Sequence, residues 1–128
     1  MNDSNRSNHW VTKFRNAFRG VRLGIHGESS FKVHFLFGGA VLVAGAAMRI
    51  DDPRQWCLLL LCITLVLGAE LFNSALERMA RAISDRHDAN LGAALDIGSA
   101  AVLVVALGAA MVGSVIFLAR LGELLDWW

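Results

Sequence analysis

The stretch WCLLLLCITLVLGAELFNSALERMARAI, residues 56–83, decides how this chain folds. Its first half is an apolar run, and its second half carries the polar residues Glu70, Asn73 and Glu77. Apolar side chains suit the hydrocarbon of a bilayer, whereas ionisable residues in or beside a membrane span are costly and mark candidate functional sites. The stretch therefore predicts a membrane helix that carries a site at one end.

The composition of the whole chain also indicates a membrane protein. Hydrophobic residues make up 55% of the 128 residues and charged residues 18%, which leaves too little polar surface for a soluble domain of this size. Cys57 and Cys62 fall in one apolar run, which favours free thiols over a disulfide. The polar N-terminus leads into basic residues rather than an apolar run, so no cleavable signal peptide is expected.

We predict an all-α integral membrane protein, with one domain over residues 1–128 that contains three transmembrane helices. Their expected ranges are about 33–50, 55–83 and 94–119. A helix needs about 20 residues to cross the hydrocarbon. Only the third range holds an apolar run of that length, residues 97–119. The first two ranges cross only if their polar ends lie at an interface or inside a bundle.

A further helix is predicted at residues 10–27, before the first span. Its apolar residues recur at steps of three and four, and basic residues fill the remaining faces. The apolar positions are Trp10, Phe14, Phe18, Val21 and Ile25. This pattern is typical of an amphipathic surface helix in the headgroup plane. A helix packed on a soluble core is the alternative, but the sequence shows no such core.

The basic residues predict the orientation of the chain. Six Lys and Arg residues precede the first span and three lie between the apolar runs 56–69 and 97–119, against three on the other side. The positive-inside rule therefore places the N-terminus and the second loop in the cytoplasm. The polar end of the second span then faces the side where nucleotide is available.

The polar residues of the second span share one helix face. Glu70, Asn73, Ser74, Glu77 and Arg81 fall in a narrow sector at 100° per residue. The two carboxylates are about 10 Å apart along the axis, too far to share a proton, so one could hold a cation while the other takes a proton. The alternatives are a polar seam between helices and an ordinary i,i+4 ion pair of Glu77 with Arg81.

Two further acids lie at the cytoplasmic ends of the other spans. Glu28 precedes the first span and Asp96 opens the third. Carboxylates that converge at one depth repel each other unless cations neutralise them, and Mg²⁺ with substrate phosphates is the natural candidate. The sequence contains no P-loop, dinucleotide-binding or protein-kinase motif.

The segments GAELFNSALE (68–77) and ALDIGSAAVL (94–103) resemble the small bacterial integral-membrane diacylglycerol kinases and the related undecaprenol kinases. The likeness covers roughly Lys13 to Ile116, and the E-x-x-N-[ST]-A-x-E element is its most specific part. The resemblance implies a homotrimer in the bacterial inner membrane. Its active sites lie between subunits at the cytoplasmic face, and its substrates are ATP and a membrane lipid, not nucleic acid.

The resemblance also implies roles for individual residues. Glu70 matches the general base that acts on the lipid hydroxyl. Glu28 and Glu77 match the ligands of the Mg²⁺ that accompanies ATP. Asn73 matches a contact to nucleotide or metal-bound phosphate, and Asp96 an acid that helps to hold the nucleotide.

The chain departs from the family pattern at two positions. Leu95 stands where the family has a lysine that meets the ATP phosphates, and His34 stands where it often has an acid. Arg81, Arg86 and Lys32 are possible substitutes for the lysine. Loss of a phosphate-binding charge can cost orders of magnitude in rate.

Several functions therefore stay open on the sequence. The leading hypothesis is a lipid kinase that converts diacylglycerol to phosphatidic acid, with undecaprenol as the alternative acceptor. The second is a non-catalytic membrane scaffold, motivated by Leu95. The third, a small transporter subunit with a proton relay, would need carboxylates near the midplane of the membrane.

Overall fold

The computed structural model describes residues 3–27, 29–83 and 88–126, and every element of regular structure in these ranges is an α-helix. The prediction of an all-α fold is therefore confirmed. The helices are α1 (Asp3–Gly27), α2 (Ser29–Ala47), α3 (Pro53–Ile83) and α4 (Ala89–Leu124).

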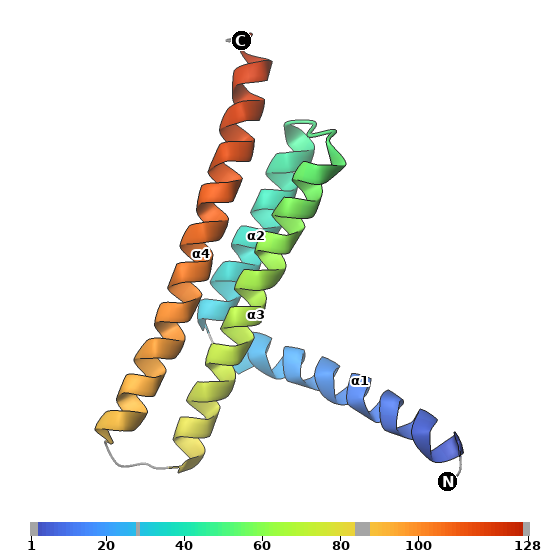
Figure 1. Ribbon diagram of the computed structural model, residues 1–128, viewed down its shortest axis with the longest axis vertical. Coiled ribbons are helices and arrows are strands. Elements are labelled where there is room, and N and C mark those ends of the chain that lie inside the picture. Colours follow the sequence, from blue (N-terminus) through green and yellow to red (C-terminus); the bar gives the residue numbers. More distant parts are fainter. Residues whose placement is uncertain (1–2, 28, 84–87, 127–128) are drawn as a thin grey trace.

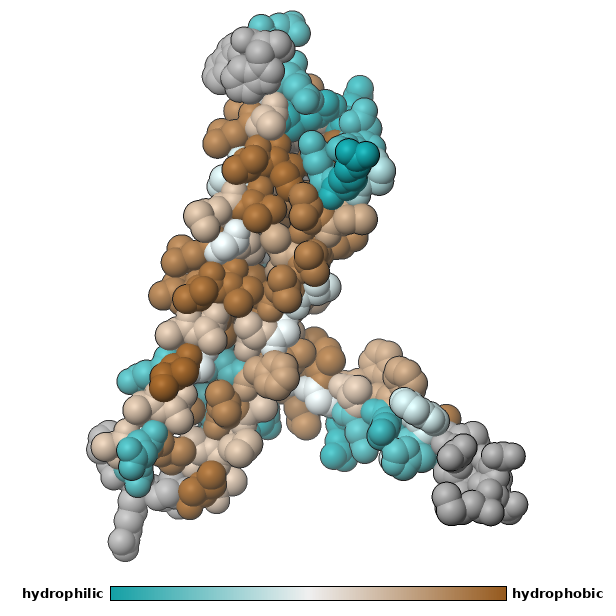
Figure 2. Space-filling view, in the orientation of Figure 1, coloured by the Kyte–Doolittle hydropathy of each residue, from teal (hydrophilic) through white to brown (hydrophobic). Residues whose placement is uncertain are grey.

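Three of these helices are long and apolar enough to cross a membrane, as predicted. They are α2, α3 and α4, which lie side by side in Figure 1, while α1 extends away from the bundle at the lower end of α2, above the lower ends of α3 and α4. Figure 2 shows brown, hydrophobic side chains over the middle of the bundle and teal, hydrophilic side chains towards both ends. This banding matches a protein surrounded by lipid.

The helix α1 has the properties predicted for a surface helix. Its large apolar side chains are exposed, among them Trp10, Phe14 and Phe18. At its other end the helix contacts α3, because the guanidinium of Arg78 donates to the carbonyl of Leu23 at 2.9 Å. An exposed apolar stripe on a helix anchored at one end suits the plane of the headgroups.

The transmembrane helices pack closely where glycines allow it. A Cβ at Gly38 would lie 3.1 Å from Ile63, and one at Gly45 would lie 3.0 Å from Trp56. Both contacts join α2 to α3. Small residues let membrane helices approach each other, since van der Waals packing drives their association.

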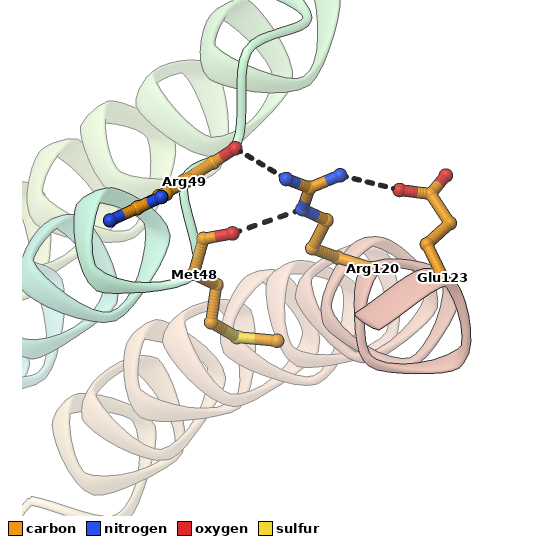
Figure 3. Close-up of polar contacts among 4 residues, drawn as sticks. All are labelled: Met48, Arg49, Arg120 and Glu123. Carbon is orange, nitrogen blue, oxygen red and sulfur yellow. Dashed lines mark hydrogen bonds and ion pairs between the residues drawn. The ribbon is translucent and has the colours of Figure 1, made fainter. Parts of the chain in front are cut away.

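The turn between α2 and α3 is held by a side chain of α4 (Figure 3). Arg120 donates from Nε to the carbonyl of Met48 at 2.9 Å and from a terminal nitrogen to that of Arg49 at 2.8 Å, and it pairs with Glu123 at 2.7 Å. Trp56 Nε1 donates to the carbonyl of Ile50 at 2.9 Å. These donors satisfy backbone carbonyls of the turn that follows the end of α2 at Ala47.

The helix α4 begins at Ala89, five residues before the predicted start at residue 94. Asp88 explains the earlier start, because its carboxylate accepts from the backbone N–H groups of Asn90 and Leu91 at 2.9 and 3.0 Å. This arrangement is an N-cap, which satisfies donors in the first turn.

Candidate active site

The buried carboxylate of Glu70 lies at the centre of the candidate site. Glu70 is on α3 and is only 1% exposed. Ser30 Oγ donates to Glu70 Oε1 at 2.5 Å, and His34 Nε2 lies 3.1 Å from the same oxygen. Both partners come from the start of α2. A buried carboxylate is costly unless it is hydrogen-bonded or paired, so these two contacts allow it to remain inside the fold.

One turn further along α3, Asn73 and Glu77 form a second polar pair. Asn73 Nδ2 donates to Glu77 Oε1 at 3.0 Å, and Arg81 lies 3.7 Å from Glu77 Oε2. The Glu77 side chain is 28% exposed, whereas that of Glu70 is 2% exposed. The two carboxylates of the stripe therefore have different environments. The structure also contains the i,i+4 pair of Glu77 with Arg81 that the sequence offered as an alternative.

The amide of Asn73 lies against Gly98 of α4. A Cβ at Gly98 would lie 2.7 Å from Asn73 Oδ1 and 3.1 Å from Leu76 Cδ1. Asn73 Oδ1 and Ser74 Oγ are buried and have no hydrogen-bond partner among the described residues. Gly98 thus gives Asn73 the space in which it presents its amide nitrogen to Glu77.

The remaining predicted site residues lie elsewhere on the helices or outside the described residues. Asp96 is exposed on α4, two residues before Gly98, and Leu95 beside it is partly buried. Glu28 and Arg86 lie outside the described residues. Lys32 is exposed on α2. The structure therefore brings together Glu70, Asn73 and Glu77 of α3. Asp96 lies two residues from Gly98 on α4, and residues at that spacing point to different faces of a helix, so the contact at Gly98 does not bring Asp96 to them.

The donors present suit a magnesium ion that is shared with substrate. Within the described part of the chain, no group of three or more His, Cys, Asp or Glu side chains could hold a metal by itself. Mg²⁺ usually binds one or two carboxylates together with substrate phosphates. The partly exposed carboxylate of Glu77 fits that mode of binding and does not fit a cage made only of protein ligands.

Sequence reasoning missed the role of α2 in the site. His34 stood out as a departure from a family pattern, and Ser30 was not singled out at all. The available signal was their spacing, because residues four apart share a helix face. That spacing does not reveal which side chain of α3 the face meets.

An apolar groove runs along the bundle from the site. Its volume is about 590 Å³, and its lining includes His34 and Val41 of α2, Val66 of α3, and Ala106 and Leu118 of α4. The α4 residues alone span about 18 Å at the helical rise of 1.5 Å per residue. His34 lines the groove and also contacts Glu70, so the groove and the carboxylate share a residue.

The fold and the site define the class of the protein: a small helical membrane protein with a buried carboxylate beside a groove suited to an apolar chain. The family described as prokaryotic diacylglycerol kinase matches residues 15–117. The chain belongs to this family. It is therefore a lipid kinase, and ATP is its co-substrate.

Two relatives illustrate the range of the family. The chain is 31% identical over 117 residues to an undecaprenol kinase of Bacillus subtilis, with 91% of this chain and 94% of the relative covered. It is 28% identical over 127 residues to a diacylglycerol kinase of Synechocystis, with 94% of this chain and 72% of the relative covered. Membership of this family favours the kinase over the scaffold and transporter hypotheses.

Proposed function

We propose that the chain transfers the γ-phosphoryl group of ATP to the hydroxyl of a membrane lipid alcohol, with diacylglycerol as the acceptor and phosphatidic acid as the product. The observation that carries the proposal is that His34 contacts the buried carboxylate of Glu70 and also lines an apolar groove. A lipid chain in this groove would bring its hydroxyl to the carboxylate.

The dimensions of the groove support an acyl chain as its occupant. One leaflet of the hydrocarbon is about 15 Å thick, half of the roughly 30 Å core. The groove lining on α4 extends about 18 Å, from Ala106 to Leu118. An acyl chain of a bilayer lipid matches this length, whereas a polyprenyl chain would extend well beyond it.

Glu70 acts as the general base in this proposal. It accepts the proton of the lipid hydroxyl as the hydroxyl oxygen forms its bond to the γ-phosphorus. The bond from that phosphorus to the oxygen bridging to the β-phosphate breaks, and ADP leaves. Phosphoryl transfer requires chiefly in-line placement and charge stabilisation, and a base within hydrogen-bond reach contributes further.

Glu77, together with Glu28, would hold the Mg²⁺ that accompanies ATP. The bound ion would neutralise charge on the transferring phosphates. Asn73 supports this role because its amide nitrogen orients Glu77 Oε1. Asp96 of α4 would help to hold the nucleotide, as the family resemblance implies.

The surroundings of the enzyme follow from the same proposal. The 128 residues would form one kinase domain, with a surface helix at 10–27 and helices at about 33–50, 55–83 and 94–119 in the bacterial inner membrane. The basic N-terminal segment and the second loop support a cytoplasmic site. We further propose a homotrimer, in which neighbouring subunits cover part of the apolar surface that one chain exposes.

Undecaprenol is the second candidate acceptor, because the Bacillus subtilis relative carries that name and aligns over most of both chains. Purified protein in vesicles that contain both alcohols in equal amounts, supplied with Mg²⁺ and γ-labelled ATP, decides between them. We expect label in phosphatidic acid. Label only in undecaprenyl phosphate would overturn the choice of acceptor, and folded protein that labels neither lipid would overturn the proposed function.

A further inference from the structure

We propose that His34 and Ser30 are positioning residues for Glu70: they hold its carboxylate through Oε1 and direct Oε2 to the lipid hydroxyl. This inference rests on the proposed function, in which Glu70 is the base. It adds that residues of α2 must orient the base, which lies on α3.

The geometry places both positioning residues on one face of α2. Ser30 and His34 are four residues apart, so their side chains lie one above the other on the same face of the helix. Both reach Glu70 Oε1, at 2.5 Å from Ser30 Oγ and 3.1 Å from His34 Nε2. Neither contact uses Oε2. The carboxylate is thus held from one side, by a helix other than its own.

The chemistry of the three groups fixes which of them donates. An ionised carboxylate is only an acceptor, so Ser30 must donate its O–H and His34 its Nε2–H. Hydrogen bonds to an ionised acceptor are roughly twice as strong as bonds between neutral groups. Two such bonds to Oε1 concentrate the stabilisation on one oxygen and restrict rotation of the group, which leaves Oε2 as the oxygen that takes the proton.

His34 contacts the carboxylate and also lines the apolar groove. Its side chain is 25% exposed and lines the groove, whereas the Glu70 side chain is 2% exposed. In the proposed reaction, a hydroxyl that arrives along the groove would come beside the imidazole that contacts Glu70.

The alternative is a purely structural contact that joins α2 to α3. Such a contact would affect stability, and it would affect the rate only through folding. A positioning role predicts instead that the rate depends on a donor at the place of Nε2, even when the helices pack normally. Glutamine at residue 34 separates the two, because its amide nitrogen donates a hydrogen bond and leucine of similar size does not.

The test compares His34→Leu, His34→Gln and Ser30→Ala with wild type in vesicles that contain the acceptor lipid. His34→Leu should lower kcat roughly 10- to 100-fold, because misplacement of a reacting group by about 1 Å has that effect. The KM for ATP should change by less than about twofold, since a loss confined to the transition state appears in kcat. His34→Gln should recover most of the lost rate, and Ser30→Ala should lower kcat in the same direction as His34→Leu.

The matched control is His9→Leu, which replaces an exposed histidine of α1 and should leave kcat unchanged. The thermal unfolding midpoint in detergent reports folding for every variant. If His34→Leu does not fold, His34→Gln and Ser30→Ala still decide, because the inference requires activity from the first and a slower rate from the second.

A double variant links the effect to the carboxylate. If His34 acts through Glu70, His34→Leu should cause little further loss in a Glu70→Gln protein, because residues that act as a unit are not additive. Wild-type kcat in both His34→Leu and Ser30→Ala would overturn the inference, as would a His34→Gln protein as slow as His34→Leu. Failure of the proposed function looks different: the wild-type protein transfers no phosphate, or Glu70→Gln is as fast as wild type.

Discussion

At the scale of single residues, two carboxylates on one helix face differ in what surrounds them. Glu70 is buried and held by hydroxyl and imidazole donors of α2, whereas Glu77 is partly exposed and contacts Asn73 and Arg81. A carboxylate with donors on one oxygen suits proton transfer, and a partly exposed one suits a hydrated cation. The difference supports separate roles for the two acids.

Replacement of the exposed acid tests its proposed role. Glu77→Gln should raise the Mg²⁺ concentration needed for half-maximal rate about tenfold or more, because removal of a charged partner costs about 1.5–3 kcal/mol. The measurement is the rate as a function of Mg²⁺ at fixed ATP. Glu123→Gln, at the opposite end of the bundle, is the control. A Mg²⁺ dependence in Glu77→Gln identical to that of wild type would remove Glu77 from the metal site.

At the scale of elements, the contact between α3 and α4 decides how Asn73 is presented. Gly98 is buried against the amide of Asn73 and against Leu76, so the two helices meet at the candidate site itself. Packing of α4 therefore positions a residue of α3 that holds Glu77.

The substitution Gly98→Ala tests this contact. The added methyl would lie 2.7 Å from Asn73 Oδ1, so the amide or the helix must shift. We expect a lower unfolding midpoint in detergent and a several-fold lower kcat.

The matched control is Gly108→Ala on the same helix, where the described structure has no atom within 4 Å of the added methyl. Alanine suits a helix interior better than glycine by about 0.5–1 kcal/mol, so the control should be at least as stable as wild type. Equal stability and rate in both variants would show that Gly98 is not needed.

The elements were predictable where a single periodicity determines them. Hydropathy predicted three membrane helices, and the 100° step placed Glu70, Asn73 and Glu77 on one face. The pairing of Glu70 with Ser30 and His34 was not predictable, because it depends on the register between α2 and α3. The contact of Gly98 with Asn73 depends in the same way on the register between α3 and α4, which a single sequence does not encode as a visible pattern.

At the scale of the whole molecule, the orientation in the membrane determines which compartment supplies ATP. The basic residues concentrate at the end of the bundle that contains α1 and the second loop, and the outer turn contains Asp51 and Asp52. By the positive-inside rule, we expect the candidate site on the cytoplasmic side.

Labelling of introduced cysteines tests this orientation. In a background with Cys57→Ser and Cys62→Ser, Asp51→Cys should react with a membrane-impermeant maleimide in intact spheroplasts. Asn90→Cys should react only after permeabilisation, because the positive-inside rule predicts that this end of α4 faces the cytoplasm. Both positions are exposed, so access rather than burial decides the outcome. The reverse pattern of labelling would place the site outside the cell and contradict the use of cytoplasmic ATP.

The most direct test of the central claim is phosphoryl transfer by Glu70→Gln. Protein in diacylglycerol-containing vesicles is given Mg²⁺ and γ-labelled ATP, and labelled lipid is counted over time. Glutamine keeps the size of the side chain but cannot act as the base, and general-base catalysis is worth about 10²- to 10⁴-fold. We predict transfer by wild type, and a loss of that size in folded Glu70→Gln that still binds nucleotide. Transfer at the wild-type rate by Glu70→Gln would contradict the assignment of Glu70 as the base.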